Sequence, residues 1–139
     1  MNPIIKNILA IVFGWLGGSL VNMGLIQTGH ALFPIEGVDI NDMTALAEVM
    51  PTLDFKYFIF PFLAHALGTF VGAAIAYLIA ANHKMKFAIA IGVLFLLGGI
   101  MVNYMLTGPT WFTVLDIVIA YIPMAYLGSS IAKKIGAKK

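Results

Sequence analysis

The pattern of apolar and polar positions divides the chain into four long apolar stretches joined by polar segments. A helix that crosses a bilayer needs about 20 mostly apolar residues, and each stretch meets that length. Connections 82–86 and 107–110 are short, so the helices on either side of each should be antiparallel neighbours. The pattern predicts an all-α polytopic membrane protein, with four transmembrane helices in an antiparallel bundle and residues 1–139 forming a single transmembrane domain. The predicted spans cover residues 4–27, 55–81, 87–106 and 111–132.

The connection over residues 28–54 is long and contains a further helical signal. Within it, residues 41–50 predict a short amphipathic helix, with Asn41 as its cap and Pro51 as its stop. We expect this helix to lie on the membrane surface or to roof the bundle with its Met and Leu face.

The lysines indicate which way the spans run. Seven of the eight cations lie on one side of the predicted topology, and Lys56 alone lies on the other. The positive-inside rule places both termini in the cytoplasm and segment 28–54 outside. We therefore expect an integral protein of a bacterial-type cytoplasmic (inner) membrane. The seven lysines are Lys6, Lys84, Lys86, Lys133, Lys134, Lys138 and Lys139.

Composition agrees with the membrane assignment and excludes several classes of function. The apolar fraction is 61% and the charged fraction 10%, whereas a soluble domain has about 45–50% and about 25%. Without cysteine, the chain has no disulfides, thiolate metal sites or thiol redox chemistry. The net charge is only +2 and the basic residues form no stripe, which argues against nucleic-acid binding. The expected partners are the lipid bilayer, further copies or a larger membrane complex, and a small ligand or ion.

Small residues recur at four-residue spacing in the first two spans. Such small-xxx-small stripes let helix backbones approach closely in lipid. We predict that these glycines, together with one in the third span, lie at helix contacts within the chain or between copies. The predicted packing residues are Gly14, Gly18, Gly68, Gly72 and Gly99.

A short motif occurs twice. Residues 17–22 and 98–103 both read G-G-x-x-V-N, in the first and third spans. The match indicates either two related helical hairpins, as in transporters built from repeats, or coincidence in an apolar chain rich in Gly and Val.

A few polar residues lie at membrane depth, and these carry the functional prediction. A carboxylate among apolar residues costs roughly 2.5–3.5 kcal/mol to insert, so Asp116 should face the bundle and have a partner. Asn103 and His65 are the two candidate partners. We predict a ligand- or proton-binding site in the outer half of the bundle, formed by Asp116, His65, Asn103, Asn22 and Thr69.

Little in the sequence supports catalysis. The chain has no nucleophile elbow, phosphate-binding loop or HExxH motif. His65 and Asp116 alone fall short of the three or four ligands that zinc requires, so no metal site is predicted. No particular cofactor is indicated.

Two functions remain open. In the first, the polar site handles a proton, a cation or a small ligand in a transport-type protein. In the second, the chain is a non-catalytic accessory or assembly subunit of a membrane complex, and the polar layer only sets the positions of the helices. A cavity beside Asp116 favours the first, and a dry, fully paired layer favours the second.

Overall fold

The computed structural model describes residues 1–138, and no strand occurs in that range. The predicted all-α class is therefore confirmed. Lys139, counted above among the cytoplasmic lysines, lies outside the described residues. The helices are α1 (Pro3–Leu32), α2 (Met43–Val49), the 3-10 helix η1 (Met50–Thr52), α3 (Lys56–Ile79), α4 (Lys84–Met105), α5 (Thr110–Ile119) and α6 (Ile122–Gly136).

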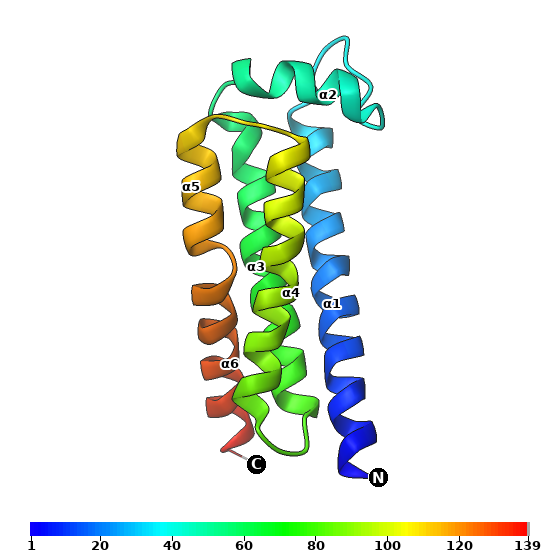
Figure 1. Cartoon of the computed structure of the whole chain (residues 1–139), viewed down its shortest axis with the longest axis vertical. Coiled ribbons are helices and arrows are strands. Elements are labelled where there is room, and N and C mark those ends of the chain that lie inside the picture. The colour runs from blue at the N-terminus through cyan, green and yellow to red at the C-terminus, as the bar shows by residue number, and fades with distance from the viewer. Residues whose placement is uncertain (139) are drawn as a thin grey trace.

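Four helical segments are long and apolar enough to span a membrane: α1, α3, α4 and the segment Thr110–Gly136. This confirms the predicted number of membrane-length helices. The four segments lie side by side along the long axis of the molecule, and the two termini lie at the same end (Figure 1). α3 packs against α1, α4 and α6, so it holds the centre of the arrangement.

α1 is longer than the predicted span, which ended at residue 27. It continues to Leu32, and the N–H of Phe33 closes it by donating to the carbonyl of Gly29 at 2.8 Å. Gly29 packs its backbone on Phe60, and the rings of Phe33 and Phe60 lie 6.2 Å apart. These contacts keep the polar end of α1 helical, although its composition is typical of a loop.

The fourth apolar segment is broken, whereas the pattern over residues 111–132 predicted one continuous helix. α5 ends at Ile119 and α6 begins at Ile122, with Tyr121 between them at φ −113° and ψ −81°. Pro123 explains the break, because proline has no N–H to donate to the Ile119 carbonyl and its ring clashes with that carbonyl in a continuous helix. Tyr121 leaves the helical path here and is buried.

α1 and α3 approach each other backbone to backbone at the predicted glycine stripes. A Cβ atom added at Gly72 would lie 2.6 Å from the carbonyl oxygen of Gly14, and one at Gly68 would lie 2.9 Å from that of Gly18. Both distances are shorter than a carbon–oxygen contact allows, so only glycine fits at this crossing.

α2 lies across one end of the bundle (Figure 1). Its cap is Asp42 rather than the predicted Asn41. Asp42 Oδ1 accepts hydrogen bonds from the N–H groups of Thr44 and Ala45, at 2.9 and 3.1 Å. Asn41 is bound instead to Asp39 Oδ1, through both its backbone N–H and its side-chain amide. The two residue types cap helices almost equally well, so composition did not separate them.

Candidate functional site

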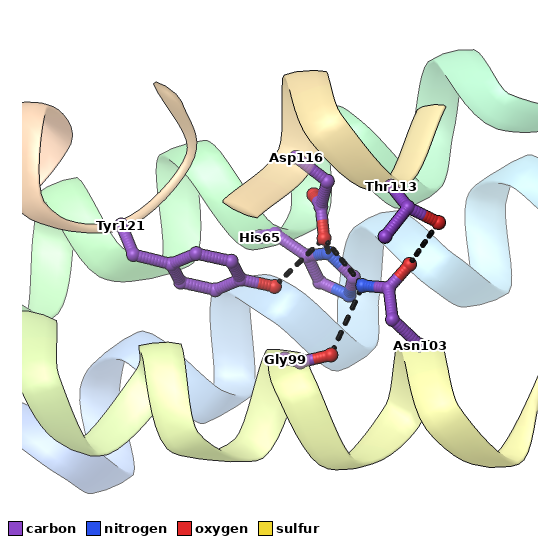
Figure 2. Close-up of polar contacts among 6 residues, drawn as sticks. All are labelled: His65, Gly99, Asn103, Thr113, Asp116 and Tyr121. Atoms are coloured by element: carbon purple, nitrogen blue, oxygen red, sulfur yellow. Dashed lines mark hydrogen bonds and ion pairs between the residues drawn. The ribbon is translucent and has the colours of Figure 1, made fainter. Parts of the chain in front are cut away.

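Polar side chains from three segments of the bundle converge on the carboxylate of Asp116 (Figure 2). Asp116 lies in α5, and its side chain is fully buried. Its oxygens are within hydrogen-bond distance of His65 in α3, Asn103 in α4 and Tyr121 at the α5–α6 junction. A buried carboxylate is strongly disfavoured unless such donors surround it. The cluster thus meets the requirement that made Asp116 conspicuous in the sequence.

His65 contacts the carboxylate through one ring nitrogen. Its Nδ1 lies 2.8 Å from Asp116 Oδ1 and 3.0 Å from Oδ2. Because a carboxylate only accepts hydrogen bonds, Nδ1 carries the hydrogen, and in the neutral ring Nε2 is left as an acceptor. The imidazole also stacks on the Tyr121 ring, with centroids 5.7 Å apart and planes 30° apart. Asp116 and Tyr121 together determine the orientation and the tautomer of this histidine.

Asn103 connects α4 to α5 through all of its polar atoms. Its amide nitrogen donates to Asp116 Oδ2 and to the carbonyl of Gly99, each at 3.0 Å. Its amide oxygen accepts a hydrogen bond from the Thr113 hydroxyl at 3.2 Å (Figure 2). Asn103 therefore has both of its N–H donors engaged and positions the carboxylate.

Tyr121 is a member of the cluster that sequence analysis missed. Its hydroxyl donates to Asp116 Oδ2 at 3.0 Å. In a continuous helix, a residue five positions after Asp116 would point about 140° away from it, so the break before Pro123 turns Tyr121 toward the carboxylate. Gly99 provides the space, because a Cβ atom there would overlap the Tyr121 hydroxyl. Pro123 inside the predicted span was the available signal.

A cavity of about 320 Å³ lies next to this cluster. His65 and Asn103 line it, whereas Asp116 and Tyr121 do not, so His65 stands between the cavity and the buried carboxylate. The His65 side chain is 12% exposed, against 0% for Asp116. From α2 and the residue that follows it, the lining residues are Met43, Leu46 and Met50.

Two predicted site residues are not bound to the cluster. Asn22 lines the cavity, and within residues 1–138 its side chain makes no hydrogen bond to another protein group. Thr69 is fully buried one helical turn after His65, and its hydroxyl has no hydrogen-bond partner in the described part of the chain. The structure therefore unites three of the five predicted residues and leaves these two outside their hydrogen bonds.

The arrangement favours a proton or a hydrogen-bonding ligand over a metal ion. Among residues 1–138, no group of three or more His, Cys, Asp or Glu side chains is placed to hold a metal. The carboxylate of Asp116 is already surrounded by hydrogen-bond donors, which repel a cation. The hydrogen-bonding group of the site that remains unused belongs to His65, on the side of the ring that faces away from Asp116.

Comparison of this chain with protein-family models, curated proteins and solved structures gave no match.

Proposed function

We propose that this chain is a transport-type membrane protein in which the His65–Asp116 pair binds a proton and the adjoining cavity binds a small ligand. The four apolar segments cross a cytoplasmic membrane as an antiparallel bundle. Both termini lie on the cytoplasmic side, because six of the seven lysines within residues 1–138 lie at that end. α2 and the cavity then lie toward the outer side.

The observation that carries the proposal is the position of His65. Its Nδ1 is held by a fully buried carboxylate, and the same side chain lines a cavity large enough for a ligand. An ionisable pair inside an apolar bundle supports the hypothesis of a functional site. A cavity beside the pair is the feature that a purely structural polar layer does not need.

The geometry supports coupling between the proton and the ligand. When the His65 ring is neutral, Nε2 accepts a hydrogen bond, and when the ring is protonated, the same nitrogen donates one. Proton binding therefore reverses the hydrogen-bonding character of the cavity wall at His65. A ligand that prefers one polarity is bound in one protonation state and released in the other.

The second candidate function is a non-catalytic accessory or assembly subunit. It is favoured by the number of donors on Asp116, because three hydrogen bonds from three segments would also serve to position the helices. Under that proposal, the exposed apolar faces of the bundle contact copies of the chain or a larger complex, and His65 need not exchange a proton.

Charge displacement on a solid-supported membrane separates the two functions. Reconstituted protein is exposed to a pH step from about 8 to about 5, the range over which histidine changes charge. We expect a transient current as His65 takes up a proton within the membrane, and His65→Gln should abolish it. His83→Asn is the matched control. His83 lies in the turn before α4 at φ 45°, a conformation that Asn tolerates.

The control variant should keep the full current, because a histidine at the membrane surface moves no charge through the bilayer. A current of equal size in the wild type and His65→Gln, or none in either, contradicts the transport-type function and leaves the accessory subunit.

A further inference from the structure

Two residues that line one end of the cavity have hydrogen-bonding capacity that the protein does not use; His30, Lys56 and Tyr57 are further polar residues of the lining. His65 Nε2 is the first, since only Nδ1 is bound to Asp116. The Asn22 side-chain amide is the second, with no protein partner found in residues 1–138. The Cβ of Asn22 lies beside Gly68, one turn of α3 from His65, so the two groups belong to the same end of the cavity. Asn103 lines that end too, but both of its N–H donors are engaged.

The remainder of the cavity is mostly apolar. Phe33 and Phe60 contribute their rings, and α2 and α4 contribute Leu46 and Val102. Lys56 is the one side chain with a permanent charge in the described lining. It is exposed at the start of α3, about 13 Å along the helix from His65. The polar end of the cavity therefore holds two neutral hydrogen-bonding groups in apolar surroundings.

These surroundings restrict the class of ligand. An organic cation is disfavoured, because no carboxylate belongs to the described lining and the one permanent charge is positive. An anionic headgroup at the polar end is also disfavoured, because it would approach the Asp116 carboxylate behind His65. The ligand group at the polar end is therefore neutral. It must donate a hydrogen bond to His65 Nε2 and form a second hydrogen bond with the Asn22 side-chain amide.

A hydroxyl group satisfies both requirements with one atom, since it donates one hydrogen bond and accepts others. We infer that the cavity binds a small, uncharged, mostly apolar alcohol or phenol. Its hydroxyl donates to His65 Nε2 and accepts from the Asn22 amide. This inference rests on the proposed function and specifies the ligand of the same site. A volume of about 320 Å³ lies at the lower end of ligand pockets, about 300–1,000 Å³, so a molecule of one or two rings fits.

A matched pair of probes tests the inference. para-Propylphenol and para-propylanisole differ in that a methyl group replaces the hydroxyl hydrogen, so the ether cannot donate to Nε2. The full chain in lipid nanodiscs is titrated with each probe, and the nitrogen NMR shift of His65 Nε2 reports binding at the site, separately from partitioning into lipid. One hydrogen bond predicts that the phenol binds about tenfold more tightly than the ether.

Asn22→Ala removes the second contact and touches none of the hydrogen bonds of Asp116, so the fold is retained. It should weaken the binding of both probes severalfold, because the oxygen of each accepts a hydrogen bond from the amide, and His83→Asn should leave both affinities unchanged. Equal affinities for the two probes in the wild type overturn the inference. So does a His65 Nε2 resonance that phenol does not move, or a phenol affinity unaffected by Asn22→Ala.

This result is independent of the pH-step current. Selective phenol binding without a His65-dependent current leaves a ligand-binding protein and contradicts proton handling. A His65-dependent current with equal affinities for phenol and ether retains the proposed function and rejects this class of ligand.

Discussion

The hydroxyl of Tyr121 donates to Asp116 Oδ2 at 3.0 Å from beyond a break in the helix that carries the carboxylate. This hydrogen bond connects the junction between α5 and α6 to Asp116 in α5. A transmembrane helix can be broken where neighbouring helices satisfy or bury the freed groups. Here the break brings a third donor to Asp116 and places the Tyr121 ring against His65.

Tyr121→Phe tests the importance of that hydroxyl. The substitution keeps the ring that stacks on His65 and removes one of the three donors to a fully buried carboxylate. We expect a loss of about 0.5–2 kcal/mol in the free energy of unfolding, measured by denaturation in detergent. Tyr126→Phe is the control, because Tyr126 is 61% exposed. A loss of the same size in both variants contradicts a specific role for the Tyr121 hydroxyl.

Adjacent glycines in α4 provide a second test. A Cβ atom at Gly99 would overlap the Tyr121 hydroxyl, whereas one at Gly98 would meet nothing within 4 Å. Gly99→Ala should therefore displace Tyr121 and lower the melting temperature. Gly98→Ala should be neutral or raise stability by up to about 1 kcal/mol, because alanine favours a helix more than glycine does. Equal melting temperatures for the two variants would mean that Tyr121 does not occupy the position described.

The close crossing of α1 and α3 predicts that Gly68 tolerates no side chain. Gly68→Leu pushes a side chain into the backbone at Gly18 and should cost about 1–3 kcal/mol of stability, as in other overpacked cores. Gly24→Leu on α1 is the control, since a Cβ atom there would meet nothing within 4 Å. An unchanged melting temperature for Gly68→Leu in detergent would show that this face does not form a helix contact.

The proposed topology is tested with compartment reporters. A reporter fused after Thr107, between α4 and α5, should report the outer side, and one fused at the C-terminus should report the cytoplasm. We expect this result because lysine-rich segments beside membrane spans stay on the cytoplasmic side. Equal signals from the two fusions would place both points on the same side of the membrane and contradict the proposed crossing between them.

The sequence predicted the central partners of the site because the cost of a carboxylate in lipid demands them. His65 and Asn103 were named as candidate partners of Asp116 from their depth, the short hairpin that carries Asn103 and the small-residue face that carries His65, and the structure brings all three together. Depth along a helix follows from a constant rise per residue, so this part of the site can be derived without knowledge of the tertiary fold.

Other parts of the site depend on packing that a linear pattern does not contain. In a continuous helix Tyr121 would point away from Asp116, and only the break at Pro123 turned it inward. The cavity is lined by residues from α1, α2, α3, α4 and α5 and from the connecting segments. Its existence follows from how these elements fit together. Asn22 has a similar predicted depth, yet it lines the cavity, and Asn103 rather than Asn22 is hydrogen-bonded to Asp116.

Both copies of the repeated motif end at this cavity. Asn22 and Asn103 close the two copies of G-G-x-x-V-N, and both line it, from α1 and α4. Their hydrogen bonding differs, because Asn103 is bound to Asp116 and Asn22 has no such bond. The two related positions therefore present one engaged amide and one free amide to the same space.

The central claim is that Asp116 holds His65 with Nδ1 protonated and Nε2 free toward the cavity. Nitrogen NMR of the neutral His65 imidazole reports directly which nitrogen carries the hydrogen. In the wild type we expect a single tautomer with the hydrogen on Nδ1. In Asp116→Asn we expect that preference to weaken, because an amide can also donate to Nδ1. A wild-type ring with its hydrogen on Nε2, or identical spectra for the two proteins, would contradict the claim.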